Sequence, residues 1–202
     1  MTPFTKKEIA TLKKYNTPAK VQDLLNSLKY NFCEKGDTVK SPANTFRTKN
    51  AHCFEGALLG AYTLSLQGHK PLLMCLKATE DDLDHVIAPF KKNGLWGALS
   101  KTNHAVLRYR DPVYKNIREL AMSYFHEYFT DNGKKTLRQY SEPLDLAIFE
   151  SSWPFDEGDL WGIDEELDKV KHFDIAPKKT IKKFRYADKL EREIGKFLEW
   201  KK

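Results

Sequence analysis

The Asn93-Gly94 pair constrains the fold most strongly, because it lies between two apolar segments that have the character of strands. Asparagine and glycine both tolerate the positive φ angles that a type I′ turn requires, and such a pair between strand-like segments is the strongest short-range signal of a hairpin. The sequence therefore predicts a β-hairpin in which residues 85–90 pair with a returning strand at residues 95–99. In a two-residue turn of this kind, the numbers of facing residues sum to 187.

An apolar segment before the hairpin, residues 53–67, is predicted to form a helix that ends at Gly68, a natural C-terminal cap. Residues 71–76 follow as a continuous apolar segment, which is typical of a buried strand. Cys53 is the first residue of the predicted helix. Unpaired N–H groups and the positive end of the helix dipole stabilise a thiolate at such a position, so Cys53 is a candidate nucleophile.

His85 opens the first strand of the hairpin, thirty-two residues after Cys53. A cysteine at a helix start and a histidine on a following hairpin can meet in space and form a thiolate–imidazolium pair. The predicted register places His85 opposite Thr102, with Ser100 one step along on the same face. Cys53 and His85 together form the candidate catalytic pair.

The group that orients His85 is left open between two neighbouring residues. Asn103 is slightly preferred, because a side-chain amide carbonyl can orient a histidine and a hydroxyl is the weaker orienting group. Asn103 can reach His85 only if the strand ends near Lys101 and the chain curls. Ser100 is the alternative, and Asp82 and Asp84 are outside candidates because adjacent strand residues face opposite ways.

The flanking segments favour an α+β fold in one domain of 202 residues, with 41% hydrophobic content. Residues 1–50 are expected to supply two N-terminal helices, which start at Thr5 and Thr17, and then a polar loop over 35–50 that leads to the cysteine. Residues 51–130 form the expected core and end in a helix over 113–128. Residues 131–202 form a C-terminal extension, of which 131–177 gives no functional interpretation.

The net charge of +6 is carried by the last 25 residues, where ten basic and four acidic residues lie between positions 178 and 202. This segment is predicted to form one amphipathic helix whose apolar stripe packs on the core, with the residues Phe184, Ala187, Leu190, Ile194, Phe197 and Leu198. A solvated basic face is preferred over a nucleic-acid-binding surface, which remains an alternative. The oligomeric state is not predicted.

Three cysteines and six histidines show no paired spacing, so neither a disulfide framework nor a metal site is expected, and no cofactor is expected. Cys33 and Cys75 are interpreted as structural thiols. Reduced cysteines, the lack of an apolar run of roughly 20 residues and the lack of an apolar signal core near the start favour a cytoplasmic protein without a membrane segment.

Cys53 is followed four, eight, eleven and fifteen positions later by Ala57, Ala61, Leu64 and Gly68. A strand, a histidine that opens the next strand, a turn and Trp96 come after them. This order over about residues 50–105 resembles the transglutaminase-like superfamily, a branch of the papain-like cysteine enzymes. In that family the tryptophan precedes the catalytic aspartate, often as Trp-x-x-x-Asp-Pro-Thr-Asn, and Ser100 stands at the aspartate position in this chain.

The resemblance implies a cysteine hydrolase or acyltransferase that acts on peptide or isopeptide bonds of a peptide or protein substrate. Cys53 would attack the carbonyl and His85 would protonate the leaving amine. Glu55 and the acidic loop at residues 80–84 are expected to be solvated and to give the cleft a negative rim that favours cationic ligands. Because Ser100 replaces the aspartate, a catalytically silent binding module of the same fold is the first alternative.

Overall fold

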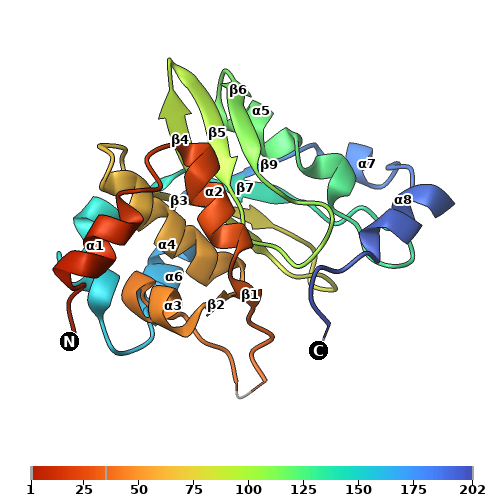
Figure 1. Cartoon of the computed structure of the whole chain (residues 1–202). Coiled ribbons are helices and arrows are strands. Elements are labelled where there is room, and N and C mark those ends of the chain that lie inside the picture. Colours follow the sequence, from red (N-terminus) through yellow and green to blue (C-terminus); the bar gives the residue numbers. More distant parts are fainter. Residues whose placement is uncertain (1, 35, 202) are drawn as a thin grey trace.

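The computed structural model describes residues 2–34 and 36–201. Met1, the first residue of the predicted loop (Lys35) and the last residue of the predicted C-terminal helix (Lys202) lie outside the described residues. The described chain is an α+β structure built on a seven-stranded sheet of order β6-β5-β4-β3-β7-β9, with β8 paired to β3 (Figure 1). All its pairs are antiparallel, and its strands are β3 (Leu72–Lys77), β4 (His85–Lys92), β5 (Leu95–Leu99), β6 (Arg110–Tyr114), β7 (Gln139–Ser141), β8 (Leu144–Asp145) and β9 (His172–Asp174). A separate parallel pair joins β1 (Lys29–Tyr30) to β2 (Asn50–Ala51).

Helices cover both faces of the sheet. They are α1 (Lys6–Leu12), α2 (Pro18–Asn26), α3 (Pro42–Thr48), α4 (Cys53–Ser65), α5 (Ile117–Met122), α6 (Trp161–Lys169), α7 (Lys178–Ile181) and α8 (Lys189–Gly195), with 3-10 turns η1 (Phe125–Glu127), η2 (Leu146–Ile148) and η3 (Trp153–Phe155). Figure 1 shows α1 to α4 grouped on one side of the molecule, with α5, α7 and α8 on the other. No helix in residues 2–34 and 36–201 combines the length and the apolar character needed to cross a bilayer.

The strands send alternate side chains into two separate apolar clusters, as the two-residue period of a strand requires. On β3, Leu73 and Cys75 pack in the cluster formed with α2, α4 and α6, whereas Met74 and Leu76 pack with α5. The same alternation on β4 places Val86 in the first cluster. The two clusters bury both faces of the central strands, which accounts for their continuous apolar sequence.

The predicted hairpin is confirmed in turn and register. Asn93 and Gly94 adopt positive φ angles of 52° and 83°, and the paired residues run from Ala88 with Leu99 to Lys92 with Leu95, so that every pair sums to 187. The predicted N-terminal caps are confirmed as well, because the side chains of Thr5 and Thr17 accept hydrogen bonds at the starts of α1 and α2.

The predicted loop over residues 35–50 is wrong in its second half, where α3 forms. Pro42 occupies the first turn of this helix, a position at which proline is favoured because its missing N–H has no partner to lose. Phe46 packs in the first cluster and Ala43 is also buried, and this burial stabilises the short helix. Pro42 therefore marks a helix start and not a loop.

The predicted helix over residues 113–128 begins too early. Its first residues belong to β6, an edge strand that accommodates Pro112 because proline cannot donate to a central ladder. The strand exposes 61% of Val113, and the helical part, α5, starts only after the Asn116 cap.

The prediction of a single C-terminal helix is also wrong. Asp188 caps a new helix, α8, so the segment divides into α7 and α8. Phe184 packs against the second cluster and Ala187 is buried. The rest of the predicted stripe is exposed to solvent: Leu190, Ile194, Phe197 and Leu198.

Candidate functional site

Cys53 is the first residue of α4, as predicted, and the helix approaches the segment after β5 very closely. A Cβ atom added to Gly56 would lie 2.4 Å from the Lys101 Cβ, and one added to Gly60 would lie 2.9 Å from a Leu99 methyl carbon. Two glycines on one face of α4 thus allow the helix to lie against the end of the hairpin. This contact brings the start of α4 to the part of the sheet that carries His85.

His85 is buried at the start of β4, and its ring is held by Ser100. The His85 Nε2 lies 2.8 Å from the Ser100 Oγ, and the Ser100 hydroxyl donates to the carbonyl oxygen of Leu107. Because the single hydroxyl proton is used toward Leu107, the oxygen accepts the Nε2 proton of His85. The other ring nitrogen, Nδ1, is then the one available to Cys53.

The thiol of Cys53 lies between two imidazoles. Burial alone would raise the pKa of Cys53, but polar interactions with the neighbouring His52 and His85 rings, together with the positive charge of these rings, bring this pKa well below its ordinary value. The start of α4 adds its dipole in the same direction. The arrangement favours a thiolate that is paired with an imidazolium.

His52 was not among the predicted site residues and is the helix cap of α4. In the neutral ring, Nδ1 accepts from the Phe54 N–H at 3.3 Å and Nε2 donates to the Thr38 carbonyl oxygen at 2.7 Å; protonation of Nδ1 gives up the first bond and keeps the second. Burial would lower the pKa of His52, but the contact with Cys53, the negative charge of Glu55 and the Thr38 carbonyl raise it to about 9. Its position directly before Cys53 at a helix start is the signal that could have identified it.

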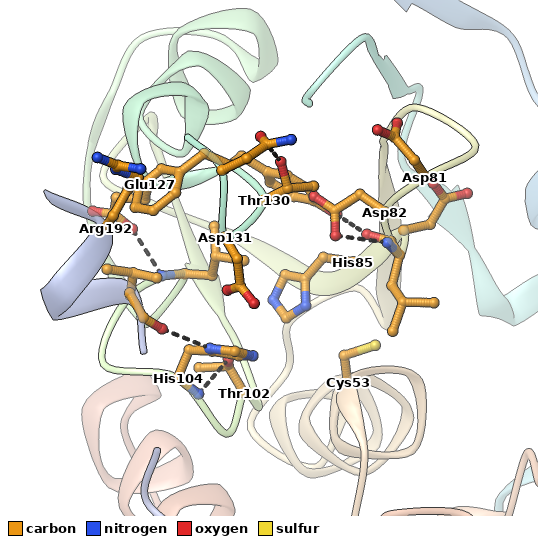
Figure 2. A pocket seen from close by; sticks show the side chains of 18 of the residues that line it. Cys53, Asp81, Asp82, His85, Thr102, His104, Glu127, Thr130, Asp131 and Arg192 are labelled. Carbon is orange, nitrogen blue, oxygen red and sulfur yellow. Dashed lines mark hydrogen bonds between the residues drawn. The ribbon is translucent and has the colours of Figure 1, made fainter. Parts of the chain in front are cut away.

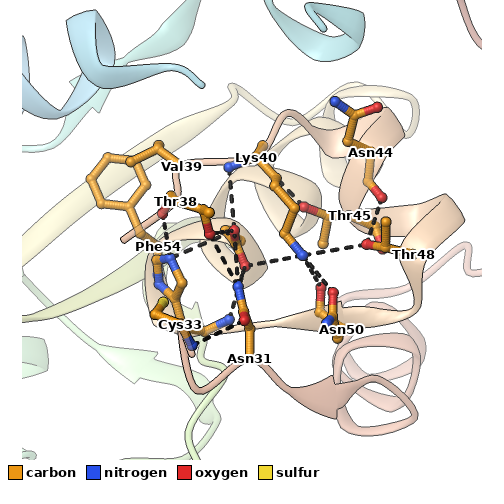
Figure 3. Close-up of polar contacts among 12 residues, drawn as sticks. Asn31, Cys33, Thr38, Val39, Lys40, Asn44, Thr45, Thr48, Asn50 and Phe54 are labelled. Atoms are coloured by element: carbon orange, nitrogen blue, oxygen red, sulfur yellow. Dashed lines mark hydrogen bonds and ion pairs between the residues drawn. The ribbon is translucent and has the colours of Figure 1, made fainter. Parts of the chain in front are cut away.

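Glu55 is fully buried, so the expectation of a solvated side chain is wrong. Its carboxylate accepts hydrogen bonds from Asn31, Thr38 and the backbone N–H of Lys40, and the Lys40 Nζ lies 3.6 Å away (Figure 3). It also accepts from the His52 backbone N–H at 3.2 Å, which completes a capping box. A buried carboxylate needs such partners, and here they fix the loop before α4 against the cysteine.

Asn103 does not contact His85, which corrects the slight preference for it. Its amide donates to the Trp200 carbonyl oxygen at 3.0 Å and its Oδ1 accepts from the Trp200 N–H at 2.8 Å, so it anchors the C-terminal segment. Thr102 accepts from the His104 N–H. The outside candidates also have other partners, because Asp84 accepts from the Ala78 N–H and Asp82 from Thr136.

Two cavities meet at Cys53. The first, of about 640 Å³, is lined by Cys53, His85, the acidic loop after β3 and the segment from Glu127 to Asn132. In the view of Figure 2, the His85 ring lies between Cys53 and Asp131, with Glu127 and Arg192 farther from the sulfur. The second, of about 580 Å³, extends past His52 toward α6.

Tyr30 lines both cavities together with Cys53 and was also missed by the sequence analysis. Burial raises the pKa of its phenol, and the negative charges of Cys53, Cys33 and Glu55 raise it further. The phenol therefore keeps its proton beside the cysteine and can donate a hydrogen bond. Cys75, in contrast, is buried in the core, and burial also raises the pKa of its thiol, as expected for a structural cysteine.

Within residues 2–34 and 36–201, no group of three or more histidine, cysteine, aspartate or glutamate side chains is arranged to hold a metal ion. The chemistry that the arrangement can support is that of an activated thiol with a neighbouring proton donor. Comparison with models of known protein families gave no match, and a search among curated proteins gave none either.

Proposed function

We propose that this protein is a cysteine-dependent hydrolase or acyltransferase that acts on peptide or isopeptide bonds, with a transglutaminase-like core. The observation that carries the proposal is the position of Cys53 at the start of α4, in one cavity with His85, whose far nitrogen is held by Ser100. Nucleophile, base and orienting group in this order form the general pattern of thiol-dependent acyl transfer.

In the proposed reaction, the Cys53 thiolate attacks the amide carbonyl and forms a C–S bond, while the carbonyl electron pair moves onto oxygen. The backbone N–H of Cys53 and the Tyr30 hydroxyl would stabilise that oxyanion. Collapse of the intermediate breaks the C–N bond, and the His85 imidazolium gives its proton to the leaving amine. Water or a second amine, deprotonated by His85, then releases the acyl group from the thioester.

Ser100 can take the orienting role of the aspartate in one respect and not in another. As an acceptor it fixes the ring and places the Nε2 proton, because its own proton is donated to Leu107. It brings no negative charge to favour the imidazolium. His52 acts on the other partner of the pair, since a positive ring beside the sulfur favours the thiolate.

The test is the rate of alkylation of Cys53 by iodoacetamide between pH 4 and pH 10, followed by mass spectrometry in a Cys33→Ser background. The proposal expects an inflection well below the ordinary thiol value of about 8.5. It also expects a burst of p-nitrophenol from p-nitrophenyl acetate of one equivalent per chain, absent in Cys53→Ala with its circular dichroism unchanged. An inflection at or above 8.5 without a burst would favour the silent binding module.

A further inference from the structure

The cavity toward α6 is separate from the space in front of His85, and the proposed reaction leaves it unused. The residues common to both cavities are Tyr30, Cys53, Leu83 and Asp84, so the sulfur lies at their junction. A substrate chain whose carbonyl reaches Cys53 has room on either side. The cavity toward α6 is therefore placed to receive a side chain next to the bond that reacts.

The walls of this cavity are largely apolar and come from distant parts of the chain. They include Phe32, Val39, Phe54, Val86 and Leu167. Trp161, at the start of α6, also lines the cavity and leaves 42% of its side chain exposed. Such walls accept the methylene groups of a long side chain, and an indole face also attracts a cation.

Four aspartates line the same cavity, and the basic group among its described lining residues is His52, at the Cys53 end; the aspartates are Asp37, Asp84, Asp164 and Asp168. Asp164 and Asp168 lie one turn apart on α6, so the helix presents both on one face, together with Trp161. Lys77 pairs with Asp168 at 2.9 Å from outside the cavity. Near α6, this one half-buried lysine pairs with one of the four carboxylates.

The pKa of Asp164 reflects the negative charge of its surroundings. Burial raises the pKa of its carboxyl, and the negative charges of Asp168, Asp84 and Cys53 raise it further. The first cavity differs, since Lys101 and Arg192 lie among the carboxylates of its lining. A cation near α6 would relieve the repulsion among these carboxylates, which Lys77 and the His52 ring neutralise only in part.

We propose that the cavity between Cys53 and α6 is a specificity site that takes a cationic side chain, a lysine or an arginine, of the substrate chain. The apolar walls hold the methylene stem, and Asp164 and its neighbouring carboxylates bind the charged end. This cation is a recognition element and takes no part in the bond rearrangement. The inference rests on the proposed function only in that it assigns the cavity to the substrate of that site.

The test compares two affinity labels of Cys53 that have similar length and differ in charge, the chloromethyl ketones of N-acetyl-lysine and N-acetyl-norleucine. The rate constant of each is divided by that of iodoacetamide with the same variant, in the Cys33→Ser background. We expect the lysine reagent to react about tenfold faster, and Asp164→Asn to reduce this preference about threefold or more. Asp37→Asn, on an exposed position of the same cavity, should reduce it less but measurably.

Asp23→Asn is the matched control, because Asp23 is exposed on α2 and lies outside the lining of both cavities. It removes the same charge and should leave the preference unchanged. Equal rates for the two labels, or a preference that survives both Asp164→Asn and Asp37→Asn, would overturn the inference. Because labelling needs no turnover, an ordinary pH profile of Cys53 would reject the proposed reaction without deciding the charge preference, and the two failures can be told apart.

Discussion

Replacement of Ser100 by alanine removes the one hydroxyl that links His85 to the backbone. The His85 Nε2 lies 2.8 Å from the Ser100 Oγ, and Ser100 is 1% exposed. In Ser100→Ala, the Nε2 proton and the Leu107 carbonyl both lose this partner in a place with little access to water. The imidazole ring loses the contact that fixes its orientation toward Cys53.

The magnitude follows from the cost of a buried donor without a partner, about 1–3 kcal/mol. Hydrogen bonds to a charged group are about twice as strong as neutral ones, so the imidazolium loses more than the neutral ring. One pKa unit corresponds to about 1.4 kcal/mol. We therefore expect the pKa of Cys53 to rise by about 1–2 units in Ser100→Ala, which lowers the thiolate fraction about 10- to 100-fold at any pH below the wild-type pKa.

The assay is the iodoacetamide profile in the Cys33→Ser background, because the thiolate reacts and the rate falls as the pH drops through the Cys53 pKa. Ser41→Ala is the matched control. Ser41 is also fully buried, and its hydroxyl donates to the Asp156 carbonyl at 2.6 Å, far along the chain from His85. The same inflection in Ser100→Ala and wild type, or an equal shift in Ser41→Ala, would refute the reasoning.

Three further changes test the surroundings of the site. His52→Asn keeps a good helix cap and removes the ring charge, so the Cys53 alkylation profile should move to higher pH. The variant should also be less stable than wild type. Because the pKa of His52 is raised to about 9, this loss of unfolding free energy should be greatest below pH 6.5 and disappear as the pH rises through 9. Burial lowers the pKa of Lys101 to about 8, so the folded protein gains stability as this lysine loses its proton. In urea unfolding, the unfolding free energy of wild type relative to Lys101→Met should therefore rise by up to about 3 kcal/mol between pH 7 and pH 10. A difference that stays constant with pH would contradict this. Gly56→Ala places a Cβ 2.4 Å from the Lys101 Cβ and should cost about 1–3 kcal/mol, whereas Gly162→Ala, with nothing within 4 Å, should be neutral or stabilising in the same urea titration.

The parts of the fold that could be predicted are those set by neighbouring residues. The Asn93-Gly94 turn determines its own geometry and thereby the register of β4 and β5, so the side of the sheet on which Ser100 lies followed from the sequence. The start of α4 at Cys53 was predictable for a similar reason, since an apolar helix follows a polar segment there. Both signals depend only on residues that are close together in the sequence.

The residue that orients His85 could not be chosen in this way, because the choice depends on distant contacts. Asn103 has the better side chain for the role, but Trp200 takes both its amide hydrogen and its carbonyl oxygen. Ser100 is held by Leu107, on a loop that lies beyond the end of the predicted strand. Nothing in the local sequence ranks one partner above the other.

The burial of Glu55 has the same origin. On a helix start, a glutamate three residues after a cap is usually solvated, and its intrinsic preference gives no reason to expect otherwise. Its partners Asn31, Thr38 and Lys40 come from a segment whose path is not encoded in its own pattern. A buried charge of this kind is recognised only once the groups that satisfy it are known.

A hydroxyl at position 100 and a histidine at position 52 are linked by the electrostatics of the thiol. A carboxylate in place of Ser100 would favour the imidazolium of His85 but would have no proton to donate to the Leu107 carbonyl, and the two acceptors would face each other. A hydroxyl satisfies both neighbours at the cost of a negative charge. His52 places positive charge on the sulfur side of the same ion pair, held there by the Thr38 carbonyl and Glu55. The pair thus draws its stabilisation from the thiolate side, and the reactivity of Cys53 should depend on His52 at least as strongly as on Ser100.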